Sequence, residues 1–203
     1  MEQSSKEKES LQDYFSIVMV GDEDVGKTSI LNRYCNNKFT TSKKKKTKSL
    51  DIYKKSLEYK SNEFMLKLWD SKYTESSFKL NKQIYERADC IIFVCSIIDK
   101  ASFTNINNWY QILSDNIDLS NKQMMILANK VDLEDDRVIG NDEIRQKAEE
   151  LDIPFYEVSA LSNTGLDEAF NAMISKMVSN TYKGETQVLK ADENNNSSGN
   201  CAN

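Results

Sequence analysis

Short apolar runs alternate along the chain with longer segments in which apolar residues recur every three or four positions. The runs are typical of β-strands, and three of them are apolar almost without a break, as in a sheet covered on both faces. The predicted strands are Tyr14–Val20, Leu50–Tyr59, Phe64–Trp69, Cys90–Ile97, Gln123–Ala128 and Pro154–Ser159. Leu50–Tyr59 alternates more regularly than the others, so it is expected near a sheet edge, paired with Phe64–Trp69.

The segments between these runs carry the spacing of amphipathic helices. The predicted helices are Lys27–Asn36, Phe78–Arg87, Ser102–Ser114, Asn141–Leu151 and Gly165–Val178. Ser102 and Asn141 are expected to cap two of them. Because strands and helices alternate, the chain is predicted to be an α/β protein with βαβ units and a mainly parallel, doubly wound sheet.

The two ends of the chain differ from its middle. Residues 1–13 and 180–203 carry little apolar surface to offset the entropy of ordering, so a flexible N-terminal extension and a flexible C-terminal tail are expected. Residues 14–179 suit one domain. Of the 203 residues, 39% are hydrophobic and 29% are charged, with a net charge of −5. This composition favours a soluble monomer and gives no sign of nucleic-acid binding.

The residue types exclude several kinds of chemistry. The chain has no histidine, which rules out Ser-His-Asp triads and His-containing zinc sites. Its four cysteines, Cys35, Cys90, Cys95 and Cys201, form no C-x-x-C pair, as expected of reduced thiols in a cytosolic protein. No apolar stretch approaches the roughly 18 residues that a membrane span requires.

A glycine-bounded loop follows the first predicted strand. Gly21–Thr28 reads GDEDVGKT and matches the pattern G-x-x-x-x-G-K-[ST] between a strand and a helix. Such a loop points backbone N–H groups inward and adds the positive end of a helix, so it binds phosphate groups. Lys27 is expected to neutralise the terminal phosphates, and the Thr28 hydroxyl to bind Mg²⁺.

A second motif selects the base. Asn129, Lys130 and Asp132 form N-K-x-D directly after a predicted strand. The Asp132 carboxylate can accept both N–H bonds from the N1 and N2 edge of guanine, an arrangement that adenine cannot offer. The motif therefore disfavours an ATP-dependent kinase, the other class of enzyme that is considered for a chain with a phosphate loop.

A third motif, Ser159, Ala160 and Leu161, follows the last predicted strand, where the Ala160 N–H can reach the guanine carbonyl oxygen. With the three motifs together, the chain resembles the Ras superfamily of small GTPases, most closely the Rab branch. The similarity runs along nearly all of residues 14–179. It implies a P-loop fold with six mostly parallel strands flanked by helices, GTP and GDP as ligands, and Mg²⁺ as cofactor.

The resemblance assigns further residues. It implies that Phe39 lies edge-on to the guanine, that Lys130 covers the other side of the base, and that Thr47 meets Mg²⁺ and the γ-phosphate. Asp70 corresponds to the residue that holds Mg²⁺ through water. The predicted nucleotide-binding residues are Gly21, Glu23, Asp24, Val25, Gly26, Lys27, Thr28, Ser29, Phe39, Asn129, Lys130, Asp132, Ser159, Ala160 and Leu161.

The second switch departs from the family pattern. Where the family has W-D-T-A-G-Q-E, Trp69–Glu75 reads WDSKYTE. Tyr73 replaces the glycine whose N–H reports the γ-phosphate. Thr74 replaces the glutamine that orients the attacking water, and its shorter side chain makes it a weak substitute at the catalytic position. Hydrolysis of GTP is therefore expected to be slow.

The charges around the phosphates also differ. Glu23 and Asp24 stand where the family has small residues, and their repulsion of a γ-phosphate favours GDP or requires a neutralising partner. Lys43–Lys48 reads KKKKTK in the presumed first switch. Two interpretations remain for this run: its lysines compensate the two carboxylates, or they form a solvated loop that contacts an acidic partner.

Partner recognition is expected to differ as well. Rab proteins commonly present three aromatic residues across the switches, where this chain has Ile52, Trp69 and Ile84. Exchange factors and effectors are expected to bind there and at Lys43–Lys48. Cys201 fits neither a C-a-a-X nor a two-cysteine ending, so a prenylated Cys201 with reversible membrane association and an unmodified tail both remain open.

Two functions remain in view. The first is a Rab-like GTP/GDP switch in vesicle trafficking, located in the cytoplasm or on the cytosolic face of an endomembrane. The second is a degenerate, binding-only scaffold. The complete set of binding residues favours nucleotide binding, whereas Tyr73 and Thr74 weigh against a normal cycle of hydrolysis.

Overall fold

A computed structural model describes residues 14–40, 50–59, 62–71 and 75–180 of the chain. Six strands form one sheet in the order β2-β3-β1-β4-β5-β6. All neighbouring strands are parallel except β2 and β3, which are antiparallel. The strands are β1 (Tyr14–Val20), β2 (Asp51–Tyr59), β3 (Asn62–Asp70), β4 (Cys90–Ser96), β5 (Gln123–Asn129) and β6 (Phe155–Val158). This sheet confirms the predicted α/β class and the expected place of β2 at an edge.

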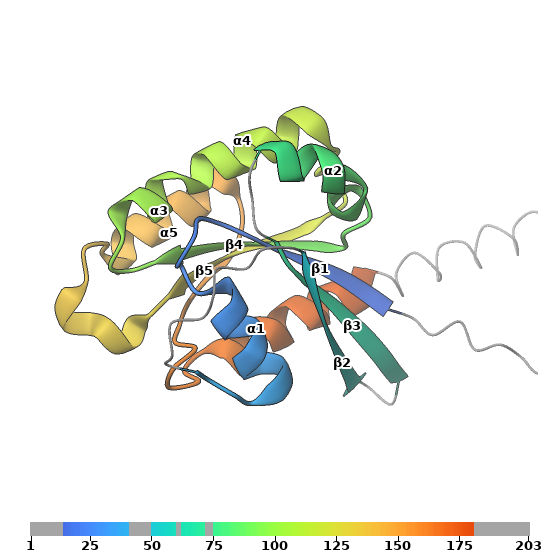
Figure 1. Ribbon diagram of the computed structural model, residues 1–203, viewed down its shortest axis with the longest axis horizontal. Coiled ribbons are helices and arrows are strands. Elements are labelled where there is room, and N and C mark those ends of the chain that lie inside the picture. Colours follow the sequence, from blue (N-terminus) through green and yellow to red (C-terminus); the bar gives the residue numbers. More distant parts are fainter. Residues whose placement is uncertain (1–13, 41–49, 60–61, 72–74, 181–203) are drawn as a thin grey trace, which may run out of the picture.

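Helices cover both faces of the sheet (Figure 1). They are α1 (Lys27–Asn36), α2 (Glu75–Glu86), α3 (Lys100–Thr104), α4 (Ile106–Asn116), α5 (Asn141–Leu151) and a C-terminal helix through the described residues 166–180. A 3-10 helix, η1 (Val131–Asp136), follows β5. On one face lie α1 and the C-terminal helix, and on the other lie α2, α3, α4 and α5.

The central strands are buried on both sides because each helical layer packs its apolar residues against them. In β4 every residue is buried, and its side chains alternate between the two layers. Ile92 and Val94 join the cluster under α1 and the C-terminal helix, whereas Ile91 and Phe93 join the cluster under α4 and α5. The nearly unbroken apolar run seen in the sequence therefore reflects a strand covered on both faces.

The structure corrects one predicted helix. The segment predicted as a single helix over Ser102–Ser114 forms α3 and α4, which meet at Asn105. The predicted caps are also wrong: Asp99 accepts from the N–H groups of Ala101 and Ser102 and caps α3, and Gly140 precedes Asn141 at the start of α5. Ser102 lies inside α3, where its hydroxyl donates to the Asp99 carbonyl instead of capping the helix.

Candidate functional site

The phosphate-loop sequence connects β1 to α1 at the edge of the sheet where the parallel strands end. Two of its glycines adopt backbone angles that other residues rarely take, with φ of 146° at Gly21 and 104° at Gly26. A Cβ on Gly21 would lie 2.2 Å from the Val94 carbonyl oxygen, and one on Gly26 would lie 2.2 Å from Asn129 Nδ2. Both glycines are required because neighbouring chain segments approach the loop so closely.

Lys27 is held inside the loop. Its Nζ donates to the carbonyl oxygens of Gly21 and Asp22, both at 2.6 Å, and the residue is only 9% exposed. Burial lowers the pKa of the Lys27 ammonium, and the carboxylate of Asp70 is the strongest influence in the opposite direction. The geometry places one positive charge at the centre of the loop, where the motif predicts phosphate binding.

Thr28 and Asp70 offer oxygen ligands beside Lys27. The Thr28 hydroxyl donates to Asp70 Oδ2 at 2.5 Å, which joins the first turn of α1 to the end of β3. Asp70 is buried, with 1% of its surface exposed. A hydroxyl and a carboxylate are hard oxygen donors of the kind that Mg²⁺ prefers, so this pair fits the cofactor that the sequence implies.

Asn129 joins the phosphate loop to the loop after β6. Its Nδ2 donates to the Val25 carbonyl oxygen at 2.8 Å, and its Oδ1 accepts from the Ala160 N–H at 3.2 Å. The residue ends β5 and is buried, with 2% of its surface exposed. A single side chain therefore brings together segments that lie more than 130 residues apart, from Val25 to Ala160.

Ser159 orients the carboxylate that is predicted to select guanine. Its buried hydroxyl donates to Asp132 Oδ1 at 2.5 Å, while Asp132 itself is exposed at the start of η1. The preceding Lys130 has a left-handed backbone with φ of 73°. Ala160 is buried and Leu161 is 45% exposed. The structure thus brings the second and third motifs into direct contact.

The other predicted nucleotide-binding residues surround this group. Val25 is buried, Ser29 is half-buried in α1, and Phe39 is partly buried against the core. Glu23 and Asp24 are exposed, and both lie close enough to Lys27 to raise its pKa. Asp24 has φ of 60°, a left-handed conformation that a glycine would adopt more readily.

The sequence analysis missed the role of Asp22. Its Oδ1 accepts from Trp109 Nε1 at 3.0 Å, and its Oδ2 accepts from Asn105 Nδ2 at 2.7 Å. The loop carboxylate is thereby directed toward α4 rather than left to repel phosphate groups. Nothing in the sequence pattern pairs Asp22 with residues more than 80 positions away.

The chain matches the family model described as the Ras family over residues 16–179. It belongs to the Ras family of small GTPases. Among known proteins it is similar to the Ras-related protein RabZ of Dictyostelium discoideum, at 30% identity over 90% of this chain and 79% of that protein. It is also 31% identical to the Ras-related protein Rab7 of Cenchrus ciliaris, over 85% of this chain and 86% of that protein.

A third relative is the Ras-related protein Rab-11B of Dictyostelium discoideum, at 30% identity over 91% of this chain and 83% of that protein. These matches make the chain a Rab-like member of the family, and membership implies guanine-nucleotide binding. Both confirm the family and the ligand class that the motifs indicate.

Several predicted site residues of this small GTPase lie outside the described part of the structure. They are Thr47, Tyr73, Thr74, Cys201 and Lys43–Lys48. The flexible tails expected at residues 1–13 and 180–203 lie outside it as well, except for Asn180, which belongs to the C-terminal helix. The described residues include no helix that is both long enough and apolar enough to cross a membrane.

The three positions expected to contact partners of this small GTPase differ in exposure. Ile52 on the edge strand β2 is 50% exposed, and it lies opposite Trp69 in the antiparallel pairing with β3. Trp69 and Ile84 are half-buried and pack against the core cluster under α2. Ile52 is therefore the most accessible of the three.

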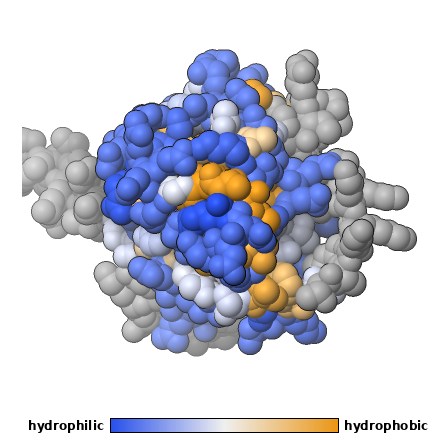
Figure 2. All heavy atoms as spheres, turned by 90° about the vertical axis from the view of Figure 1, so that its left-hand side faces the viewer, coloured by the Kyte–Doolittle hydropathy of each residue, from blue (hydrophilic) through white to orange (hydrophobic). Residues whose placement is uncertain are grey.

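Figure 2 faces the side of the molecule that carries the loop after β5. It shows a hydrophobic area near the middle of this face, bordered by hydrophilic residues.

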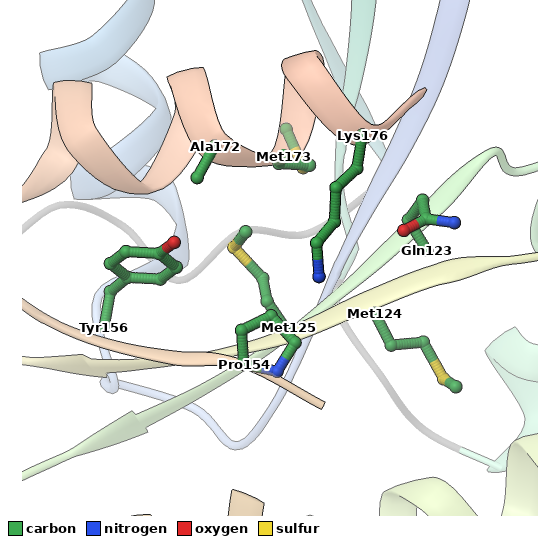
Figure 3. Close-up of a pocket in the computed structure, with 8 residues that line it drawn as sticks. All are labelled: Gln123, Met124, Met125, Pro154, Tyr156, Ala172, Met173 and Lys176. Atoms are coloured by element: carbon green, nitrogen blue, oxygen red, sulfur yellow. The ribbon is translucent and has the colours of Figure 1, made fainter. Parts of the chain in front are cut away.

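A separate pocket lies under the C-terminal helix (Figure 3). It is lined by Gln123, Met124, Met125, Pro154, Tyr156, Ala172, Met173 and Lys176. Gln123 in this pocket begins β5 and lies about 20 Å from Asn129 at the end of that strand, at a rise of about 3.3 Å per residue, whereas Tyr156 lies nearer because it pairs with Leu127. None of the residues that line the pocket is among the predicted nucleotide-binding residues.

Proposed function

We propose that this chain is a Rab-like molecular switch that binds GTP and GDP with Mg²⁺ and acts in vesicle trafficking. The trafficking role rests on its similarity to Rab proteins, and the cytoplasm or the cytosolic face of an endomembrane is its proposed location. The single observation that best supports binding is the position of Asn129. Its side chain joins the phosphate loop at Val25 to the base-recognition loop at Ala160.

The contacts support separate roles for the motifs in binding phosphate, Mg²⁺ and guanine. Lys27 would neutralise the phosphates, and Thr28 with Asp70 would hold Mg²⁺, which supplies charge stabilisation at the phosphates when it is bound. Asp132 would accept from the N1 and N2 groups of guanine, with Ser159 holding its carboxylate in place. Ala160 would donate its N–H to the guanine carbonyl oxygen.

We propose that hydrolysis of GTP by this protein is slow. Tyr73 and Thr74 replace the glycine that senses the γ-phosphate and the glutamine that orients water. Positioning of the water is a main contribution of the protein to this reaction, so a threonine at the glutamine position removes much of it. Glu23 and Asp24 add negative charge at the exposed rim of the loop and favour GDP over GTP.

The test begins with the nucleotide that copurifies with the protein, released by denaturation and identified by chromatography, and continues with single-turnover hydrolysis of bound GTP. Guanine nucleotide and slow hydrolysis are expected. Copurified ATP would contradict the guanine assignment, and hydrolysis at the rate of a small GTPase with an intact second switch would contradict the inference from Tyr73 and Thr74.

The Thr74→Gln variant refines this test. It is expected to restore little hydrolysis as long as Tyr73 remains, because glutamine positions water only when the backbone beside it can approach the γ-phosphate. Full recovery in Thr74→Gln alone would show that Tyr73 is compatible with a working switch.

A binding-only scaffold is the second candidate function, favoured by the same two substitutions in the second switch. Such a scaffold would bind its partners equally well with GDP and with a non-hydrolysable GTP analogue. A switch would bind them in one nucleotide state only, because the partner then distinguishes two conformations. Pull-down of partners with the two loaded forms separates the two functions.

A further inference from the structure

Arg33 connects α1 to the base-recognition loop. Its Nε donates to the Ala160 carbonyl oxygen and its Nη2 to the Leu161 carbonyl oxygen, both at 2.9 Å. Its Nη1 donates to the carbonyl and side-chain oxygens of Asn37, at 3.3 and 3.2 Å. All three guanidinium nitrogens therefore have partners within the protein, so the side chain acts by holding other groups.

The arginine holds two consecutive peptide groups at once. A guanidinium presents its N–H groups in a rigid, planar arrangement, and two of them here meet successive carbonyl oxygens. Fixing the carbonyls of Ala160 and Leu161 restricts the backbone that follows the Ala160 N–H. That same N–H donates to Asn129 Oδ1 at 3.2 Å, so the guanine carbonyl oxygen would share it with this acceptor. The base-recognition loop is thus held from two directions.

The same side chain reaches the residue that is predicted to lie edge-on to guanine. The guanidinium carbon of Arg33 lies 6.0 Å from the centre of the Phe39 ring, within the range of a cation–π interaction. Phe39 follows α1 through Asn37, whose left-handed backbone ends the helix and returns its N–H to the carbonyls of Asn32 and Arg33. Arg33 therefore contacts both Phe39 and the loop whose Ala160 N–H is predicted to meet the guanine carbonyl oxygen.

We propose that Arg33 is a positioning residue for guanine recognition. It holds the carbonyls of Ala160 and Leu161, and so keeps the Ala160 N–H, which donates to Asn129 Oδ1, where the guanine carbonyl oxygen would share it. It also steadies Phe39, and it does not touch the nucleotide itself. This role rests on the proposed function, since it presumes guanine bound against residues 159–161. A purely structural tether would instead stabilise the fold and leave base discrimination unchanged.

The test compares dissociation of GDP and 6-thio-GDP from the full chain. In 6-thio-GDP a sulfur atom, which is a weaker hydrogen-bond acceptor, replaces the carbonyl oxygen that Ala160 is predicted to contact. The wild-type protein is expected to release 6-thio-GDP about tenfold faster than GDP, as for the loss of one good hydrogen bond.

Arg33→Lys keeps the positive charge but cannot bridge both carbonyls. This variant is expected to release GDP about tenfold faster than the wild type and to lower the ratio of 6-thio-GDP to GDP release to below about threefold. Arg33→Gln, which removes the charge and keeps a planar donor, is expected to show the same smaller ratio. If Arg33→Lys does not fold, the release ratio of Arg33→Gln tests the proposal.

Arg145→Lys is the matched control. Arg145 on α5 donates to Asn141 and lies over the Phe155 ring, so the same chemical change is made away from the base-recognition loop. Its nucleotide release is expected to equal that of the wild type.

The outcomes separate this inference from the proposed function. If Arg33 variants release both nucleotides faster but keep the wild-type ratio, Arg33 is only a structural tether and the inference is wrong. If the wild-type chain binds no GDP, the proposed function and the inference fall together. A reduced ratio in the Arg33 variants with an unchanged ratio in Arg145→Lys supports both.

Discussion

At several positions of the candidate site the surrounding atoms leave room for only one type of residue. Gly26 ends the phosphate loop in a left-handed conformation beside the Asn129 side chain. Asp132 depends on one hydroxyl for its orientation. At this scale the roles of Gly26, Asn129 and Asp132 follow from their motifs, and the structure adds the contacts that explain why each residue type is needed.

Gly26→Ala is expected to abolish GDP binding and to lower the free energy of unfolding by about 2–4 kcal/mol, because the new Cβ would displace Asn129 and strain the backbone. Urea denaturation and nucleotide titration measure the two effects. Gly140→Ala is the control: its backbone is extended and the nearest atom to the new Cβ would be Glu143 Oε2 at 3.9 Å, so a cost below about 1 kcal/mol is expected. Equal costs in both variants would show that the Asn129 contact is unimportant.

Asp132→Ala is expected to remove the preference for guanine over hypoxanthine, since only guanine carries an exocyclic amine that can donate a hydrogen bond to the carboxylate. The wild type is expected to bind GDP about ten- to a hundredfold more tightly than IDP, and the variant about equally. Competition binding measures the ratio. Asp136→Ala, at the other end of η1, is the control and should keep the wild-type ratio. A preserved ratio in Asp132→Ala would assign base selection to another residue.

Contacts between neighbouring helices and loops hold the candidate site in place. The Asp22 carboxylate joins the phosphate loop to the junction of α3 and α4, where Asn105 and Trp109 donate to it. The break between α3 and α4 was not predicted, because the periodicity of Ser102–Ser114 continues through it. The two helices thus place an indole and an amide beside the loop, an arrangement that helical spacing alone does not reveal.

Trp109→Phe is expected to lower the free energy of unfolding by about 1.5–3 kcal/mol, since it removes a hydrogen bond to a charged carboxylate. Trp69→Phe provides the comparison, because Trp69 Nε1 donates to the neutral Ser16 hydroxyl at 3.0 Å. Its cost is expected to be about 0.5–1.5 kcal/mol. Urea denaturation measures both, and a larger loss in Trp69→Phe would rule out a strong contribution from the Asp22 contact.

At the scale of the whole molecule, nucleotide binding and folding should be linked. The candidate site draws on β1, α1, β3, β5, η1 and the loop after β6, so a bound nucleotide would hold segments from most of the chain together. A ligand that binds only the folded state stabilises it in proportion to the logarithm of its concentration.

GDP at about 100 times its dissociation constant, with Mg²⁺, is expected to add about 2.7 kcal/mol to the free energy of unfolding. For a chain of this size that corresponds to a rise in the melting temperature of about 5–11 °C. Scanning calorimetry with ADP as the control measures the effect, and ADP is expected to leave the melting temperature unchanged. An equal shift with ADP would contradict guanine selection by the site.

The sequence by itself determined the fold class, the order of the strands along the chain and the three motifs. Each of these depends on residues that are close in sequence: the spacing of apolar positions, the two glycines before Lys27, and the short distance from Asn129 to Asp132. Only the tertiary structure decided that Asn129 joins two loops, that Asp22 is directed to Trp109, and that Arg33 holds Ala160. Those contacts connect residues 104, 87 and 127 positions apart, and only the packing of helices on the sheet brings such residues together.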